Sequence, residues 1–267
     1  NLIDNSNEHI IIHQEEDLFS SPNIAVIYQI NTHNILKLLY GEALQDHRDR
    51  AFSEPEKIQS YELNYLANFE QWHINTSIFQ NNAHHLLRVS QRIDPDTGIY
   101  KNVSVNSGKF NSHGAELLIK YQANEQFNFE MATTWQKTED KHNPDIAVGE
   151  SPKWLVKAKL NYKLAPFTYS VFSYYVGEMK SDFRFVDSTI QGEYERLGET
   201  VGASLSIGAN IRYQNESSGF YGNLHVENLL DEEIRYPANE LINLQRGLIA
   251  HERQIVLTLG RSEEHTS

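Results

Sequence analysis

The sequence predicts an all-β protein whose antiparallel strands belong to a transmembrane β-barrel. Apolar and polar residues alternate in about eleven stretches of about eight to fifteen residues, which is longer than the roughly five or six residues typical of strands in soluble sheets. The connections alternate between short turns of about three to five residues and polar loops of about twelve to twenty-eight. Outer-membrane barrels have this arrangement, because their turns are short on one side of the membrane and their loops are long on the other.

Each predicted strand follows from a period of two, since successive side chains of a strand point to opposite faces. In order, the strands are expected at 24–30, 35–43, 57–67, 72–79, 108–121, 127–136, 153–163, 167–176, 201–213, 220–228 and 251–260. The clearest is 201–213, where Leu205, Ile207 and Ile211 share one face and Ser204, Ser206 and Arg212 share the other. A partial strand is also expected at 10–13. The long polar connections are expected at 44–55, 80–107, 137–152, 177–198 and 229–250.

Composition agrees with a barrel and excludes other classes. Apolar residues make up 39%, the mean hydropathy is −0.55 and no eighteen consecutive residues are apolar, so a transmembrane helix is not expected. Barrel strands escape that test because only alternate residues face lipid. A soluble β-sandwich remains the alternative. It is disfavoured because one face of strands such as 153–163 carries Lys153, Lys157, Lys159 and Lys163, which are costly to bury in a sandwich core.

Charge and motifs exclude several functions. The chain has no cysteine, so it has no disulfide and no cysteine-based zinc site, and its net charge of −13 argues against a nucleic-acid partner. No metalloprotease, hydrolase, P-loop or dinucleotide motif occurs. We therefore expect no catalytic residue, no metal site, no cofactor and no enzyme activity.

The two ends of the chain indicate an incomplete protein. No basic and apolar leader opens the sequence, so an exported protein of this sequence would be a mature form or a fragment. The last seven residues, 261–267 (RSEEHTS), are unlike the strand before them and read as translated sequencing adaptor. We expect a single partial barrel domain over 1–260 and an artefactual tail over 261–267.

Several segments resemble TonB-dependent outer-membrane receptors. The stretch GFYGNLHVENLLDEEIRYP, with Asn228, Leu229 and Asp231, is similar to the family's NLFDKxY segment near the C-terminus, although Leu230 and Ile234 replace the usual Phe and Tyr. Tyr40-Gly41 is similar to the start of the family's YGxAFRAPS segment, although the FRAP box is absent here. Pro55-Glu56-Lys57, followed by Tyr61-Glu62, is similar to PEKxxxYELG. Gly114 and Glu116 match the end of NxGxxxxxGxE, and Pro152 matches the proline of xPxH.

The resemblance implies a barrel of about 22 strands filled by a plug domain, of which this chain would be the C-terminal half without the plug. It implies a receptor in the outer membrane of a Gram-negative bacterium, with membrane lipid, lipopolysaccharide and, through the plug, the TonB complex as partners. The expected ligand is a ferric siderophore; haem, cobalamin or a glycan are the alternatives within the family. An outer-membrane enzyme of the phospholipase type and a soluble β-sandwich binding module are the alternatives from other classes.

The candidate ligand-binding residues lie in or beside the expected long loops. Neutral imidazole is a common metal ligand, and arginine attracts anionic chelates. The candidates are His47, His84, His85, Arg88, Arg92, His142, Arg184 and Arg196. The alternative interpretation is that they are solvated loop side chains.

Overall fold

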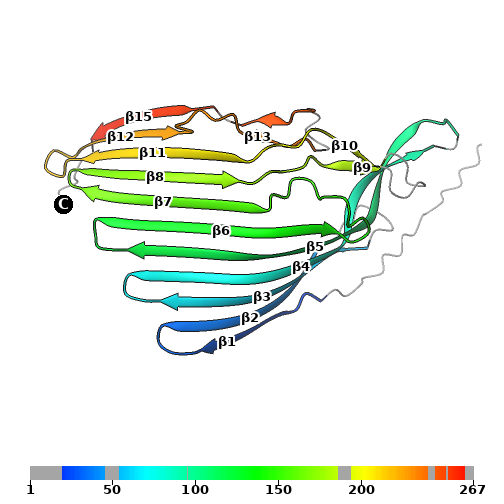
Figure 1. Ribbon diagram of the computed structural model, residues 1–267, viewed down its shortest axis with the longest axis horizontal. Helices are drawn as coiled ribbons and strands as arrows, with labels where there is room; N and C mark the ends of the chain where they lie inside the picture. Colours follow the sequence, from blue (N-terminus) through cyan, green and yellow to red (C-terminus); the bar gives the residue numbers. More distant parts are fainter. Residues whose placement is uncertain are drawn as a thin grey trace, which may run out of the picture.

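The computed structural model describes residues 20–45, 54–94, 96–185, 194–239, 244–250 and 252–261. Eleven strands form one antiparallel sheet in the order β1-β2-β3-β4-β5-β6-β7-β8-β11-β12-β15 (Figure 1). The strands are β1 (Asn23–Gln29), β2 (Asn34–Gln45), β3 (Glu56–Asn68), β4 (Trp72–Ile93), β5 (Tyr100–Gln122), β6 (Phe127–Asp140), β7 (Trp154–Leu164), β8 (Phe167–Val176), β11 (Ser204–Gln214), β12 (Phe220–Glu227) and β15 (Gln254–Arg261). This confirms the predicted all-β class and the eleven strands.

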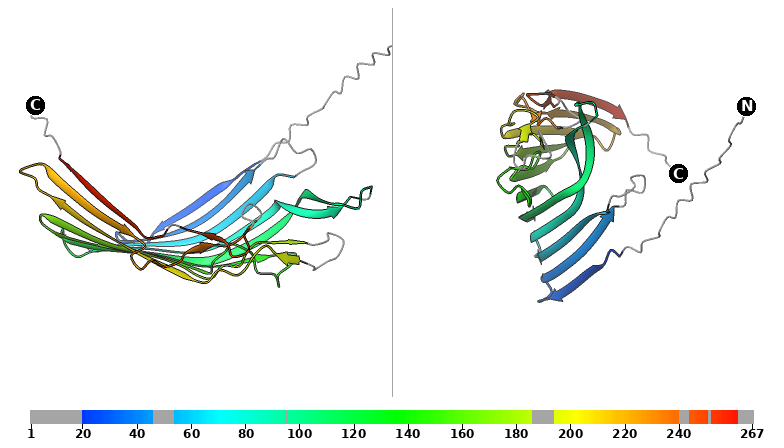
Figure 2. Two further views of the ribbon diagram at one scale, coloured as in Figure 1. Left: turned by 90° about the horizontal axis from the view of Figure 1, so that it is seen from above. Right: turned by 90° about the vertical axis from the view of Figure 1, so that its right-hand side faces the viewer.

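The part of the chain that the structure describes contains strands and no helix, so no helix there could cross a membrane. The sheet is strongly curved but does not close on itself: β1 and β15 form its two edges (Figures 1 and 2). The predicted partial strand at 10–13, and 262–267 of the predicted tail, lie outside the described residues, whereas Arg261 ends β15.

The register places apolar side chains on one face of every strand. Leu38 of β2 pairs with Val26 of β1 and with Leu63 of β3, and Leu63 pairs with Ile78 of β4. The same row continues through later strands as Ala115, Trp135 and Trp154. We call this side of the sheet the apolar face, and the opposite side, with residues such as Asn64, Ser77, Glu130 and Lys157, the polar face.

Exposure shows that the polar face is the concave one. Asn64 and Ser77 are only 7% and 5% exposed, whereas their chain neighbours Leu63 and Ile78 on the apolar face are 39% and 58% exposed. Curvature produces this difference, because side chains converge inside a trough and spread apart outside it (Figure 2). The sheet therefore presents an apolar outside and a crowded polar inside, as a membrane barrel does.

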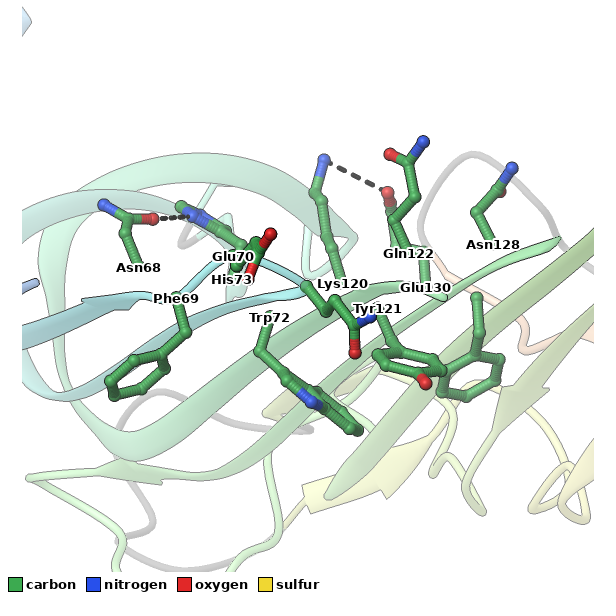
Figure 3. A pocket seen from close by; sticks show the side chains of 12 residues that line it. Asn68, Phe69, Glu70, Trp72, His73, Lys120, Tyr121, Gln122, Asn128 and Glu130 are labelled. Atoms are coloured by element: carbon green, nitrogen blue, oxygen red, sulfur yellow. Dashed lines mark hydrogen bonds and ion pairs between the residues drawn. The ribbon is translucent and has the colours of Figure 1, made fainter. Parts of the chain in front are cut away.

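The side chains at the short-turn end of the sheet point to both of its faces. Phe69, Trp72 and Tyr121 extend to one side of the sheet and Lys120 and Glu130 to the other (Figure 3). The rings of Trp72 and Tyr121 are 4.2 Å apart, and Lys120 Nζ lies 3.1 Å from Glu130 Oε2. Aromatic residues also occupy this end of other strands, as expected for an interfacial girdle: Tyr28, Tyr65, Phe127, Tyr162, Phe167, Tyr213 and Phe220.

Aromatic residues of the polar face lie over glycines of the neighbouring strand. A Cβ on Gly208 of β11 would come within 2.2 Å of the Phe172 ring of β8, its cross-strand partner. Gly114 stands in the same relation to Phe79 of β4. These rings cover bare backbone, which suits an interior with little room for bulky side chains.

The structure corrects one predicted connection. Residues 80–107 were expected to be a loop, but β4 continues to Ile93 and β5 begins at Tyr100, so both strands extend past the rest of the sheet as a hairpin (Figure 1). A bulge at His84 and His85, where His85 has a φ of 57°, interrupts the pairing. Two other long connections hold short strands: β9 (Phe183–Phe185) with β10 (Tyr194–Arg196), and β13 (Arg235–Tyr236) with β14 (Leu248–Ile249).

Candidate functional site

The long connections gather at one end of the sheet, opposite the short turns (Figure 1). Three of them, 141–153, 177–203 and 228–253, bond to one another through their backbones. Glu150 N donates to Lys180 O at 3.0 Å, and Asp182 N donates to Ala238 O at 2.9 Å. We call these three connections the loop platform.

Arg196 holds the centre of the loop platform. Its Nη1 donates to Ser181 O at 2.7 Å and its Nη2 to Ala147 O at 2.6 Å, so one guanidinium joins two of the three loops. The guanidinium also lies 5.3 Å from the Phe183 ring and 5.6 Å from the Tyr194 ring. These contacts occupy Arg196 with protein partners and give it a positioning role within the candidate site.

The motif after β12 forms a fixed corner at the base of the platform. Asn228 is 4% exposed; its side chain donates to Glu232 O at 2.9 Å and accepts from Glu232 N at 3.0 Å. Asp231 accepts from Arg253 Nη2 at 2.6 Å, and this hydrogen bond lowers the pKa of the Asp231 carboxyl. Asn228 and Asp231 both have a positive φ, which asparagine and aspartate tolerate better than most residues. Leu229 N donates to Ile207 O at 2.7 Å, so the motif is also tied to β11.

A second cluster of motif residues braces β2, β3 and β4 near their loop ends. Glu42 accepts from Gln59 Nε2 at 2.7 Å and pairs with Lys57 Nζ at 2.7 Å, and the Tyr40 hydroxyl donates to the same carboxylate. Glu56 accepts from Leu87 N at 2.8 Å, just beyond the bulge in β4.

The remaining motif residues lie in or beside the strands of the sheet. Pro55 precedes β3, Gly41 lies in β2 beside Asn23, and Gly114 packs under Phe79. Tyr61 is an outward residue whose ring lies 5.0 Å from that of Tyr40, while Glu62 and Glu116 point to the polar face. The family-like residues therefore brace and shape the sheet.

The predicted ligand residues in the described part of the chain lie on β4, in the connection after β6, and on β9 and β10, and β9 is in contact with β4. His84 and His85 lie at the bulge of β4, with ring centroids 6.4 Å apart, and His85 Nδ1 lies 2.9 Å from Glu54 Oε2. His142 is exposed in the loop after β6, where its backbone bonds to Asp140. The backbones of Arg88 and Arg92 lie in the part of β4 beyond the bulge, and the backbone of Arg184 lies in β9. His47 lies outside the described residues.

Below the platform, the polar face has a hollow that the sequence pattern did not single out. It is lined by Lys157 and Lys159 of β7, Phe172 and Tyr174 of β8 and Glu130 of β6, among others. Lys157 Nζ lies 5.2 Å from the centroid of the Tyr174 ring. No group of three or more metal-ligating side chains occurs among the described residues. The arrangement offers a polar, partly cationic wall beneath a set of joined loops.

A curved sheet of long strands, apolar outside and polar inside, with short turns at one end and joined loops at the other, is the wall of an outer-membrane type of β-barrel. A family model, TonB dependent receptor-like, beta-barrel, matches residues 5–229, and the chain belongs to that family. Members of this family are receptors of the Gram-negative outer membrane. No curated protein sequence matches the chain.

Solved structures of similar fold share little sequence with this chain. The ferric-catecholate import receptor Fiu from E. coli K12 aligns with a TM-score of 0.68 and 15% identity over 89% of this chain and 34% of its own. The siderophore receptor PiuA from Acinetobacter baumannii aligns with a TM-score of 0.66 and 15% identity over 90% and 35%. The copper transporter OprC aligns with a TM-score of 0.67 and 13% identity over 88% and 38%. The chain thus spans about a third of the length of these proteins.

Proposed function

We propose that the chain is part of a TonB-dependent receptor that imports a ferric siderophore across the outer membrane. Family membership is the observation that carries this proposal, supported by the siderophore receptors among the similar structures. In this proposal the chain supplies part of the barrel wall and of the external loops, with the remaining strands and the plug contributed by the rest of the receptor.

The role that we propose for the chain is capture and passage of the ligand, without bond-making chemistry. The loop platform would form part of the outer rim of the ligand site, and Arg196 would keep its loops in place. The polar face would line the passage below, with lysines such as Lys157 and Lys159 facing an anionic chelate or acidic groups of a plug. TonB, acting on the plug, would supply the energy for release of the ligand into the passage.

The test is uptake by intact cells. A strain that carries the complete receptor gene should accumulate radiolabelled iron from a siderophore mixture, and deletion of that gene or of TonB should abolish the accumulation. Parallel assays with haem, cobalamin, oligosaccharides and copper use the same strains. Uptake of one of those ligands and not of ferric siderophores would replace the siderophore as the proposed ligand, and uptake independent of TonB would contradict the transport mechanism.

A further inference from the structure

The hollow in the polar face places lysine side chains beside aromatic rings. Its volume is about 370 Å³, and sites for small molecules typically measure about 300–1,000 Å³, so it is large enough for part of a chelate. Its lining includes two lysines of β7 and two aromatic residues of β8: Lys157, Lys159, Phe172 and Tyr174. We call these four residues the wall site.

The two lysines of the wall site keep their charges available for a ligand. Lys157 and Lys159 are two residues apart on one face of β7, so their side chains begin about 7 Å apart. Glu130 is the cross-strand partner of Lys159, but its carboxylate lies 3.1 Å from Lys120 Nζ. Among the residues that the structure describes, neither Lys157 nor Lys159 forms an ion pair, and both are exposed. An anion in the hollow would therefore meet two ammonium groups.

The aromatic rings of the wall site are held by their neighbours. Tyr174 is 40% exposed, and its ring centroid lies 5.2 Å from Lys157 Nζ. The Phe172 ring stacks on the His225 ring of β12, with the centroids 5.6 Å apart and an interplanar angle of 14°. It also covers Gly208, where no side chain competes for the space. Rings that are already in place can stack on a ligand ring at a low cost in conformational entropy.

The wall site lies directly below the loop platform. Tyr174 is three residues before Gly177, where the platform begins, which is about 10 Å along an extended strand. Glu130, at the other side of the hollow, also lines a second hollow toward the short turns, together with Lys120 and Gln122 (Figure 3). The two hollows therefore follow one another along the wall, from the loop end toward the short-turn end.

We propose that the wall site binds an anionic chelate that carries aromatic rings, of the catecholate type, during its passage through the receptor. Negatively charged oxygens of the chelate bind the ammonium groups of Lys157 and Lys159, and one of its rings stacks on Tyr174. A neutral hydroxamate chelate offers neither the charge nor the ring. This inference rests on the proposed function and narrows it to one chemical class of ligand and one route along the wall.

The first experiment tests the chemical class. Cells whose only receptor for ferric chelates is the complete receptor are given radiolabelled iron(III), either as its 2,3-dihydroxybenzoate complex or as its neutral acetohydroxamate complex. TonB-dependent uptake should be about tenfold faster from the first complex, the effect expected of a charge-assisted hydrogen bond. Uptake that is equal or faster from the hydroxamate overturns the inference. TonB-dependent uptake from a siderophore mixture but not from the dihydroxybenzoate complex also overturns it, and leaves the proposed function intact. Absence of TonB-dependent uptake from all three would contradict the proposed function instead.

The second experiment locates the site. Lys157→Gln with Lys159→Gln removes both ammonium groups and should slow uptake from the dihydroxybenzoate complex about tenfold. Lys157→Arg with Lys159→Arg keeps the charges and should retain the uptake. Lys37→Gln with Arg212→Gln removes two cations elsewhere on the polar face and is the matched control. An equal loss in the control variant, or no loss in the Lys157/Lys159 glutamine variant, overturns the wall site.

The Tyr174 ring provides an independent test. Tyr174→Leu should slow uptake from the same complex about fivefold, whereas Tyr174→Phe keeps the ring and should not. Equal rates in these two variants overturn the stacking contact. Rates are expressed per receptor in the outer membrane, and if the lysine variant does not fold, the tyrosine variants decide.

De-energised cells separate passage from capture, because they bind the chelate at the loops without importing it. There the Lys157/Lys159 glutamine variant should lose far less binding than it loses uptake in energised cells. A loss of binding as large as the loss of uptake would place the two lysines in the capture site and overturn their role in passage.

Discussion

Arg196 illustrates how one side chain can hold separate loops together. The residue joins the loops 141–153 and 177–203 through two carbonyls, and one of them belongs to Ser181, which is 1% exposed. Charge-assisted hydrogen bonds of this kind are worth more than neutral ones because one partner carries a full charge. Loss of this side chain should loosen the loop platform without changing the sheet.

We therefore predict that Arg196→Ala raises protease cleavage in 177–203 and lowers ligand affinity, with a local cost of about 1–3 kcal/mol. Limited proteolysis of the purified receptor, with mass spectrometry of the fragments, measures the first effect. Arg212→Ala, which removes an exposed arginine bonded to Gln214 at 3.0 Å, is the control. Cleavage equal in both variants would argue against the bracing role.

Asp231 makes the corner after β12 sensitive to acid. Arg253 lowers the pKa of the Asp231 carboxyl in the folded protein, so the stabilisation from this contact is complete above the unfolded pKa of about 3.9 and is lost as the pH falls through the folded value. Hydrogen exchange of 229–235 should therefore increase below about pH 4 beyond the intrinsic rate. Asp231→Asn should show fast exchange at every pH. A pH step of the same size in that variant would rule out Asp231 as its origin.

Among the elements, β12 separates the two faces most simply. Leu224 pairs with Ile211 and Leu257 on the apolar face, while the adjacent Asn223 pairs with Arg212 and Thr258 on the polar face. We predict that Leu224→Arg costs about 2–4 kcal/mol in lipid, because it places a charge near the middle of the apolar band. Asn223→Arg should cost far less. Denaturant unfolding of the receptor in lipid vesicles measures both, and equal costs would contradict the assigned faces.

The period-two pattern predicts a strand correctly where its two faces differ in polarity. Where the two faces are alike, the pattern does not reveal the strand. All eleven strands of the sheet were found because Leu63, Ile78 and similar residues alternate with polar neighbours. The pattern of residues 80–107 predicts a loop because the far parts of β4 and β5 extend beyond the apolar band, so neither face there needs apolar residues. The strands β9, β10, β13 and β14 have two or three residues each, too few to show a period.

The candidate site was harder to predict than the fold for a related reason. Arg196 could be selected as a long-loop arginine, but its partners Ser181 and Ala147 are set by how separate loops meet, which no local pattern encodes. The pairing of Asp231 with Arg253 likewise joins residues that are distant in the chain. By contrast, the motif Asn228-Leu229-Leu230-Asp231 was recognisable because its tight corner depends on its own side chains.

At the scale of the whole molecule, the proposed function places the two ends of the sheet on opposite sides of the outer membrane. Thr97, in the turn of the β4–β5 hairpin, lies at the loop end, and Glu216, in the turn between β11 and β12, lies at the opposite end; both are exposed. This chain has no cysteine, so a thiol introduced at either position is the single thiol in this part of the receptor, and the unsubstituted receptor serves as the labelling control. We predict that Thr97→Cys reacts with a membrane-impermeant maleimide on intact cells, whereas Glu216→Cys reacts only after the outer membrane is permeabilised. The reverse pattern would invert the proposed orientation.

The hydrogen bonds among the three connections of the loop platform also bear on how such a receptor could be re-engineered. A connection that contacted only the ends of its own strands could be transplanted alone from a relative with another specificity. Here Glu150, Asp182 and Glu199 bond to backbone or side-chain partners in neighbouring connections, so a foreign segment would leave donors and acceptors of the other two unmatched. A chimaera that changes specificity would have to exchange 141–153, 177–203 and 228–253 as one graft.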